Sequence, residues 1–242
     1  MGNYIDYISG ITFRFIKPQT PWAPLACVNF TPWRRIGTSL ELANTKIPDR
    51  GAEMKEALRD ICNIPRMSTF AIGAIINEGV YRMSEGKAFV NVGVWHGFTL
   101  LSGMKSNGHK RCIGVDDFSQ YGSPQAAFYQ RFDAFGKPSH EFYEMDCVAY
   151  FSAVHTGEIG LYLYDGHHSY KNQLRALRAA EPFFSEDCII LLDDTNYGEV
   201  RKGVKDFISS SPYHYRILFD ITTSCNYHPT FWNGIMILQR VP

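Results

Sequence analysis

Apolar and polar residues follow different patterns on the two sides of Gly86. Beyond Gly86, short apolar runs alternate with segments in which apolar residues recur at helical spacing. Strands that alternate with helices are typical of a doubly wound α/β fold with a parallel sheet. We predict five such strands, at residues 87–94, 110–118, 140–146, 159–166 and 187–195. The last is the most apolar, which favours a central position in the sheet.

The C-terminal end departs from this alternation. Residues 213–221 and 233–240 both have strand-like patterns, and no helical segment separates them. We therefore expect an antiparallel pair that closes the sheet.

The N-terminal end differs again. Residues 1–48 look irregular and are rich in proline and aromatic residues, so we expect a packed arm or lid. Asp49 is a plausible N-cap for a helical pattern, and a second helix is predicted to start at Pro65 and stop at Gly86. We accordingly divide the chain into an N-terminal extension, 1–84, for lid, substrate or dimer contacts, and a ligand-binding domain, 85–242.

Composition narrows the class of protein. The 242 residues carry 24 basic and 24 acidic side chains, and this neutrality disfavours binding to nucleic-acid phosphates. Because no apolar run approaches the roughly 20 residues of a membrane span, we expect a cytoplasmic protein without membrane contact. The six cysteines form no C-x-x-C pair and are expected to be reduced.

Ligands of doubly wound sheets gather at the carboxyl ends of the strands. The first strand ends in a glycine turn, Gly93 to Gly97, that leads into a helix, although its spacing is not the dinucleotide fingerprint G-x-G-x-x-G. Asp116 follows Gly93 by 23 positions, a suitable spacing for an acid that binds ribose hydroxyls. Asp146 ends the third strand, where it could contact adenine or simply cap a helix.

Three carboxylates end the last two strands of the parallel series. Asp165 follows residues 159–164, and Asp193 and Asp194 follow a very apolar run. If these strands are neighbours, the carboxylates converge and repel one another unless a cation compensates them. A hard divalent ion such as Mg²⁺ accepts such oxygen ligands. The alternative is that one acid caps a helix and another faces water.

Two adjacent histidines, His167 and His168, follow Asp165. A zinc site would need further nitrogen or sulfur ligands, and neighbouring residues on one loop rarely point to one metal. Either histidine could act as a general base near neutral pH, whereas His168 could equally hydrogen-bond the loop backbone.

The order of these signals resembles that of class I S-adenosylmethionine-dependent methyltransferases. "FVNVGVWHGFTLL" resembles their first cofactor motif and "CIGVDDFS" the second. The most specific match is "LYDGHHSY" followed by "LLDDTN", which resembles the pattern of small-molecule O-methyltransferases related to macrocin O-methyltransferase. The resemblance covers roughly residues 85 to 240 and implies a mostly parallel, seven-stranded sheet whose last strand is antiparallel.

The resemblance also implies roles for particular residues. The cofactor, S-adenosyl-L-methionine, would contact the glycine turn, the ribose acid and the adenine side. His167 would replace an acid proposed as the base, with Asp165 beside it in the reaction. The implied cofactor-binding residues are Asn91, Gly93, Gly97, Asp116, Asp146, Cys147 and Asp165, and the implied Mg²⁺ ligands are Asp165, Asp193 and Asp194. Asn91 departs from the family, because the first motif usually carries an acid there.

We therefore expect a divalent-metal-assisted O-methyltransferase that acts on a hydroxyl of a small molecule, such as a sugar or glycosylated metabolite. An NAD-dependent oxidoreductase shares the sheet, but the glycine spacing and the paired aspartates disfavour it. A catalytically silent cofactor-binding module is the other alternative. The acceptor would contact the N-terminal arm and the loops "QYGSPQ" and "TSCNYHPTFWN", and the aromatic arm is a candidate surface for a homo-oligomer.

Overall fold

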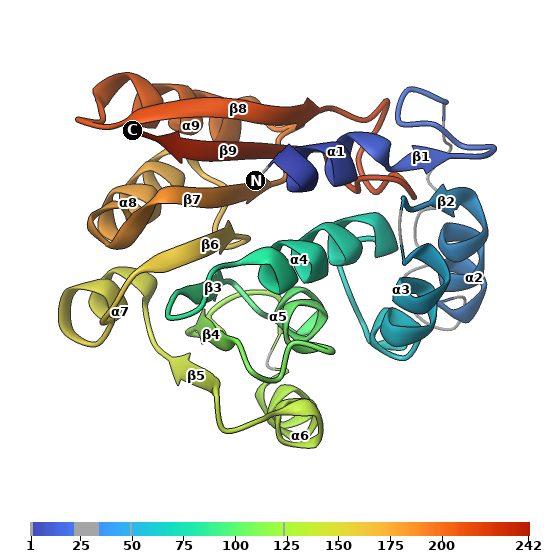
Figure 1. The fold of residues 1–242 in the computed structure, drawn as a ribbon, viewed down its shortest axis with the longest axis horizontal. Helices are drawn as coiled ribbons and strands as arrows, with labels where there is room; N and C mark the ends of the chain where they lie inside the picture. Colours follow the sequence, from blue (N-terminus) through green and yellow to red (C-terminus); the bar gives the residue numbers. More distant parts are fainter. Residues whose placement is uncertain (1, 22–33, 49, 123) are drawn as a thin grey trace.

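A computed structural model describes residues 2–21, 34–48, 50–122 and 124–242 of the chain. Its main sheet has seven strands in the order β5-β4-β3-β6-β7-β9-β8 (Figure 1). Strands β3 to β7 are parallel, and β9 is antiparallel to both of its neighbours, which confirms the predicted fold class. The strands are β3 (Ala88–Val92), β4 (Arg111–Asp116), β5 (His140–Glu144), β6 (Ile159–Tyr164), β7 (Phe184–Asp193), β8 (His214–Ile221) and β9 (Ile235–Val241).

The strand order reverses at β3, which lies between β4 and β6. A crevice for ligands forms at such a switch point, outside the carboxyl ends of the strands. Beyond β6 lies β7, in parallel register with Tyr164 opposite Leu192. The prediction that these two strands are neighbours is therefore confirmed. The strand predicted to be central, β7, has a neighbouring strand on each side. The middle strand of the seven, however, is β6.

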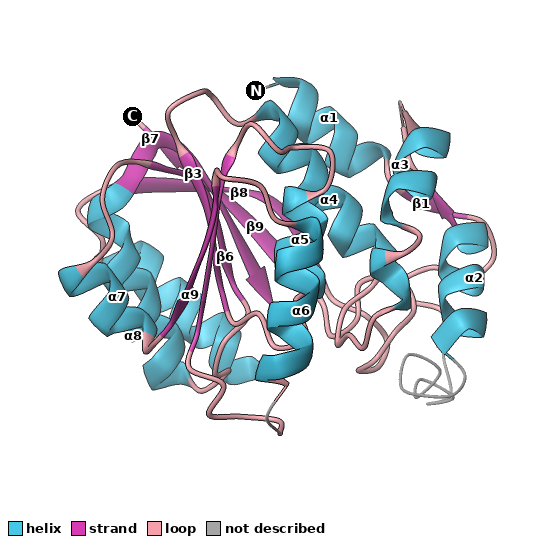
Figure 2. Cartoon of the chain, turned by 90° about the horizontal axis from the view of Figure 1, so that it is seen from below, coloured by secondary structure: helices cyan, strands magenta, loops and turns pink. Residues whose placement is uncertain are grey.

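Helices cover both faces of the sheet, and Figure 2 shows the two layers edge-on. One layer contains α4 (Phe70–Arg82), α5 (Phe98–Met104) and α6 (Gln125–Phe135). The other contains α7 (Cys147–Ala153), α8 (Tyr170–Ala180) and α9 (Gly198–Ser210), with a short η3 (Glu181–Phe183) after α8. Each layer has its own apolar core against the sheet.

The prediction of an irregular segment at residues 1–48 was wrong for its described part. That part contains α1 (Gly2–Gly10), a two-stranded antiparallel sheet of β1 (Thr12–Phe13) and β2 (Thr45–Lys46), and α2 (Arg34–Asn44). The signal for α1 was a helical spacing of apolar residues, all of them buried: Tyr4, Tyr7, Ile8 and Ile11. Asp49, the predicted N-cap, lies outside the described residues; α3 (Gly51–Leu58) and η2 (Ile61–Asn63) follow it.

Helix α4 starts at Phe70 rather than at Pro65, and a tertiary contact explains the difference. The carboxylate of Glu41, on α2, accepts a hydrogen bond of 2.7 Å from the backbone N–H of Phe70. The side chain of Glu41 thus caps α4 from another helix, a contact that local sequence does not encode.

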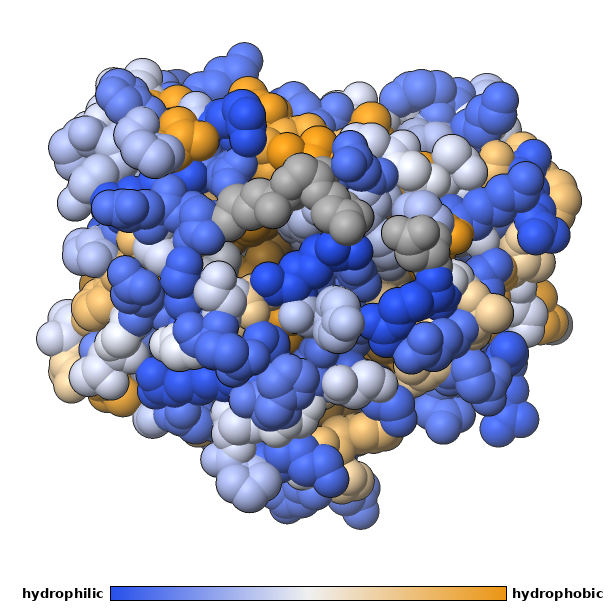
Figure 3. Space-filling view, viewed as in Figure 1, coloured by the Kyte–Doolittle hydropathy of each residue, from blue (hydrophilic) through white to orange (hydrophobic). Residues whose placement is uncertain are grey.

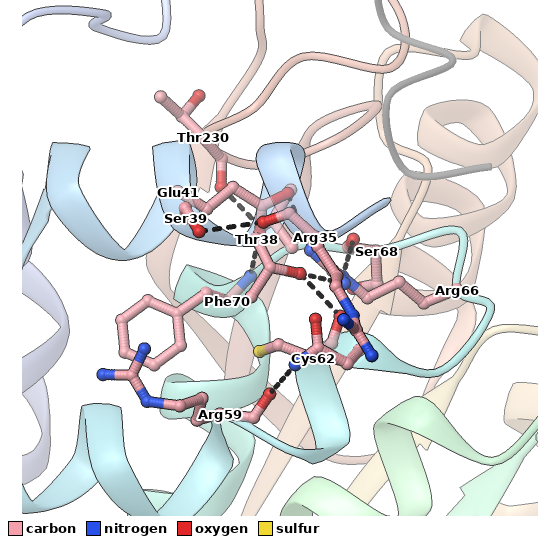
Figure 4. Close-up of polar contacts among 12 residues, drawn as sticks. Arg35, Thr38, Ser39, Glu41, Arg59, Cys62, Arg66, Ser68, Phe70 and Thr230 are labelled. Atoms are coloured by element: carbon pink, nitrogen blue, oxygen red, sulfur yellow. Dashed lines mark hydrogen bonds and ion pairs between the residues drawn. The ribbon is translucent and has the colours of Figure 1, made fainter. Parts of the chain in front are cut away.

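The same carboxylate forms a buried ion pair with Arg66, Nη2 to Oε1 2.9 Å (Figure 4). The Arg66 guanidinium also donates to the carbonyl of Ser68 and to the hydroxyl of Thr38. Because a buried charge without its partner is costly, this pair fixes the segment 66–68 against α2.

Two sequence expectations concern the whole chain. Within the described ranges, no helix is long and apolar enough to cross a membrane. The described cysteines are free thiols: Cys62, Cys112, Cys147, Cys188 and Cys225.

Candidate functional site

Two adjoining cavities open at the carboxyl ends of β3, β4 and β6. The first, here the carboxylate cavity, is lined by Asp165, His168 and Asp194 and by the segment 66–68. The second, here the Cys147 cavity, is lined by Cys147 and by other residues of the β5 and β6 ends. Both share one wall, made by Gly93, Asp116, Asp117, Ser119, Gln120 and Gly166. A ligand that spans both cavities would therefore cross the glycine turn.

The glycine turn is built from backbone conformations that disfavour side chains. Gly93 has φ +83°, and a Cβ there would lie 2.1 Å from the carbonyl oxygen of Asp165. Gly97 has φ +100° directly before α5. Only glycine tolerates the first of these positions without a shift of the backbone.

Asn91 supports the turn from beneath. Its side chain is fully buried, and its Nδ2 donates a hydrogen bond of 2.9 Å to the carbonyl of Gly93. The amide oxygen of Asn91 is buried and has no hydrogen-bond partner among the described residues. Neither Asn91 nor Gly97 lines either cavity, so both shape the turn rather than face a ligand.

Asp116, the predicted ribose acid, is held by backbone donors. One carboxylate oxygen accepts from the N–H groups of Val94 and Trp95, at 2.7 and 2.8 Å, and the other accepts from Phe118. The neighbouring Asp117 is exposed and also lines both cavities. The strand end therefore offers two acids to a diol, of which sequence reasoning selected one.

In the Cys147 cavity, the predicted adenine-side residues lie together. Asp146 caps α7 by accepting from the N–H groups of Val148 and Ala149, and it pairs with Arg175 at 3.0 Å. Burial raises the pKa of the Cys147 thiol to about 11, so this cysteine is a neutral, weakly polar wall.

The three predicted carboxylates meet at the ends of β6 and β7. Burial raises the pKa of Asp165 well above its usual value, and the charges of Asp193 and Asp194 raise it further. Asp193, only 2% exposed, shares a hydrogen bond with Asp165, and burial raises its pKa as well. One oxygen of Asp193, Oδ1, is buried and has no hydrogen-bond partner within the described ranges. The raised pKa values mean that the negative charges of the three carboxylates are not fully compensated.

Asp194 has an unusual backbone conformation, with φ +59°. Its Oδ1 accepts a 2.7 Å hydrogen bond from Asn233, and its Oδ2 lies 3.0 Å from Nε2 of His168. Burial raises the pKa of Asp194, although His168 and Asn233 act in the opposite direction. Strained positions of this kind cluster at functional sites.

The structure places the two histidines the other way round from the sequence interpretation. His168 reaches the carboxylates, and His167 fixes the loop: its Nδ1 accepts a 3.1 Å hydrogen bond from the backbone N–H of Ser169. His167 is exposed and lines the Cys147 cavity, on the other side of the shared wall. Its position therefore gives no support to a base at the carboxylate cluster.

The carboxylates fit the chemistry of a hard cation but are not arranged around one. In the part of the chain that the structure describes, no three His, Cys, Asp or Glu side chains form a ready metal site. The oxygen donors, their raised pKa values and the unpartnered Oδ1 of Asp193 nevertheless match what a divalent cation binds.

Aromatic rings form much of the remaining wall of the carboxylate cavity. Two of the predicted acceptor loops contribute here, as "QYGSPQ" supplies Tyr121 and "TSCNYHPTFWN" supplies Tyr227 and Trp232. Sequence reasoning missed Tyr197 and the segment 66–68, which lies outside the motifs. The aromatic lining consists of Trp95, Phe98, Phe118, Tyr121, Tyr197, Tyr227 and Trp232.

The comparisons with known proteins agree with this fold. Residues 90–195 match the family model described as a methyltransferase domain. The comparison with curated proteins gives no match. Among solved structures, a protein of Corynebacterium glutamicum is 13% identical with a TM-score of 0.56, over 79% of this chain and 89% of that one.

Two further structures are O-methyltransferases by their descriptions. A putative caffeoyl-CoA O-methyltransferase from Staphylococcus aureus is 12% identical, with a TM-score of 0.56 over 76% of this chain and 91% of that one. A TDP-rhamnose 3′-O-methyltransferase of calicheamicin biosynthesis is 14% identical, with a TM-score of 0.56 over 91% of this chain and 96% of that one. The latter coverage includes most of the N-terminal extension, since residues 85–242 are only about two thirds of the chain.

The matched residues run from β3 to just past the end of β7, and the solved structures share the fold. The match over residues 90–195 confirms the predicted resemblance to S-adenosylmethionine-dependent methyltransferases.

Proposed function

We propose that the protein is an O-methyltransferase that transfers the methyl group of S-adenosylmethionine to a hydroxyl of a small, ring-bearing molecule, with the aid of a divalent cation. One observation carries the proposal: two of the three carboxylates at the β6 and β7 ends, Asp165 and Asp194, line the same aromatic-walled cavity as Gly93 of the glycine turn. The descriptions of two neighbours of the same fold as O-methyltransferases, one of a nucleotide sugar, support this choice of acceptor.

The cofactor is proposed to lie across the shared wall of the two cavities. Asp116 or Asp117 would accept the ribose hydroxyls, and Asp146 and Cys147 would border the adenine. The methionine end would then cross Gly93 into the carboxylate cavity, which brings its methyl group toward Asp165. Holding donor and acceptor in line can supply about 7–11 kcal/mol of the barrier.

Asp165, Asp193 and Asp194 would hold the divalent cation. When bound, such an ion lowers the pKa of a coordinated hydroxyl and fixes its direction. The carboxylates themselves orient the acceptor, and the aromatic rings exclude water from the methyl group.

His168 is proposed to accept the proton of the acceptor hydroxyl. With Asp194 ionised, the 3.0 Å contact places a proton on Nε2 of His168, which leaves Nδ1 as the acceptor. This Nδ1 has no hydrogen-bond partner in the described part of the chain, and burial lowers the pKa of the ring, so His168 is neutral and able to take up a proton.

Ligand binding tests the proposal at its first step. We expect S-adenosylhomocysteine to raise the melting temperature. At a hundredfold excess over its Kd, it should stabilise the folded protein by about 2.7 kcal/mol. NAD at the same concentration should have no effect. Stabilisation by NAD alone would instead establish the oxidoreductase alternative. Saturable cofactor binding without turnover on any nucleotide sugar, glycosylated metabolite or catechol would point to a silent module.

A pair of variants tests the assignment of the histidines. His168→Gln should lower kcat by about 10²- to 10⁴-fold, because it removes the proton acceptor. His167→Gln, made on the adjacent residue, should lower kcat by less than about threefold, since its ring accepts from the loop backbone and lines the Cys147 cavity rather than the carboxylate cavity. The measurement is kcat with acceptor and cofactor both saturating. A larger loss in His167→Gln than in His168→Gln would return the base role to His167.

A further inference from the structure

A group of basic side chains lies beside the carboxylate cavity and takes no part in the function proposed above. It consists of Arg34 at the start of α2, Arg131 on α6 and His96 in the glycine turn; burial and the charge of Arg66 lower the pKa of Arg34, and burial and the charge of Arg34 lower the pKa of Arg131. Nη1 of Arg131 lies 3.1 Å from Nδ1 of His96 and donates to the backbone carbonyl of His96. Arg66 lines the cavity with its guanidinium 5.4 Å from the ring centre of Phe98.

Two of these charges have no counter-charge. Arg66 is paired with Glu41, but neither Arg34 nor Arg131 forms an ion pair with any residue that the structure describes. The Nη1 atom of Arg34 is buried and lacks a hydrogen-bond partner within those ranges. Residues 22–33, which precede Arg34, include no aspartate or glutamate. Because the whole chain is neutral, this imbalance is local.

The remaining member of the group does not add charge near neutral pH. Burial lowers the pKa of His96 to about 4, and Arg131 and Arg34 act in the same direction. His96 is therefore neutral, and its Nδ1 accepts from Arg131. This contact turns the Arg131 guanidinium toward the glycine turn, whose Trp95 lines the carboxylate cavity.

We propose that Arg34 and Arg131 bind an anionic group of the acceptor, a phosphate or a carboxylate, while its hydroxyl lies at the carboxylate cluster. A guanidinium group matches such anions with two parallel hydrogen bonds. The cofactor's proposed contacts lie at Gly93, at Asp116 and in the Cys147 cavity, whereas Arg34 and Arg131 line neither cavity. The inference names the substrate class of the proposed methyl transfer and rests on that proposal.

Binding of inorganic pyrophosphate to the full chain, measured by calorimetry, tests this site. The titration is made with S-adenosylhomocysteine present and in chelator, so that pyrophosphate cannot bind through a metal ion. We expect saturable binding that Arg34→Gln and Arg131→Gln each weaken by at least about tenfold. Arg35→Gln is the matched control, because Arg35 is an exposed neighbour on the same helical turn; it should leave the Kd unchanged.

Each other result has a definite meaning. No saturable binding to the unmodified protein, or an equal loss in Arg35→Gln, overturns the inference. An equal weakening of S-adenosylhomocysteine and pyrophosphate in the Arg34 and Arg131 variants also overturns it, because the arginines would then hold the cofactor's own carboxylate. Melting temperatures without ligand show that each variant is folded. Failure of the unmodified protein to bind S-adenosylhomocysteine would contradict the proposed function instead, whatever pyrophosphate does.

Discussion

Asp193→Asn is expected to lower the rate of methyl transfer by about 10³-fold or more while the Kd of S-adenosylhomocysteine changes by less than about threefold. Asp193 is the most deeply buried of the three carboxylates, and its Oδ1 has no partner in the described structure. It lines neither cavity, so it supports the cluster from below rather than touching the cofactor. Removal of its charge should therefore separate catalysis from cofactor binding.

The same substitution should not destabilise the metal-free protein. Burial and repulsion from Asp194 disfavour the ionised form of Asp193, and asparagine is neutral with nearly the same shape. We expect the melting temperature in chelator to stay level or rise. In the unmodified protein a divalent cation should raise it, and Asp193→Asn should lose that response.

The control is Glu186→Gln, which removes an exposed charge from the same strand, far along β7 from its carboxyl end. It should leave the rate, the cofactor affinity and the response to cation unchanged. Full turnover of Asp193→Asn in chelator would contradict the role of the carboxylate and of the metal together.

The sheet could be predicted from sequence because each strand and helix after Gly86 carries its own periodic pattern. Residues 159–164 and 187–192 are nearly all apolar, as strands buried on both faces must be, and their pairing follows from the rules of α/β topology. The prediction for residues 1–48 was wrong because proline and aromatic content was given more weight than the helical spacing of Tyr4, Tyr7 and Ile8. The start of α4 was predicted wrongly because the residue that caps it, Glu41, belongs to another helix, α2.

The residues of the site also divide into those that could be predicted from the sequence and those that could not. Asp165 and Asp194 were predictable because they end neighbouring strands, and strand ends converge by topology. The choice between His167 and His168 was not, since adjacent loop residues point to opposite sides of a wall that only the folded chain defines. Arg66 carries no motif at all; its place in the cavity depends on the ion pair with Glu41 (Figure 4).

The formal neutrality of the chain does not show where its charges lie. On the face shown in Figure 3, hydrophilic side chains cover most of the surface, with apolar patches between them. Charge balance over the whole chain argued against a nucleic-acid partner, but it could not reveal Arg34 and Arg131, whose imbalance is confined to one part of the fold. A local cluster of two charges is compatible with a formal net charge of zero.

Gly93→Ala is expected to abolish cofactor binding and to lower the free energy of unfolding by more than about 3 kcal/mol. The added Cβ would lie 2.1 Å from the carbonyl oxygen of Asp165 and 2.5 Å from its carbonyl carbon, so the backbone of β3 or β6 must move. Such a shift separates the glycine turn from Asp165, the two walls between which the cofactor's methyl group is proposed to lie. The measurements are chemical denaturation and calorimetry with S-adenosylhomocysteine.

Gly86→Ala provides the matched control, because the two glycines share a backbone conformation and differ only in their surroundings. Gly86 has φ +80° against +83° for Gly93, but a Cβ at Gly86 would meet nothing within 4 Å. It should cost only the 1–2 kcal/mol or so of placing a side chain in the left-handed region, and cofactor affinity should be unchanged. The difference between the variants then measures the contact with Asp165 alone. Equal losses of stability would show that strain at φ, rather than close approach of β3 to β6, is what requires glycine in the turn.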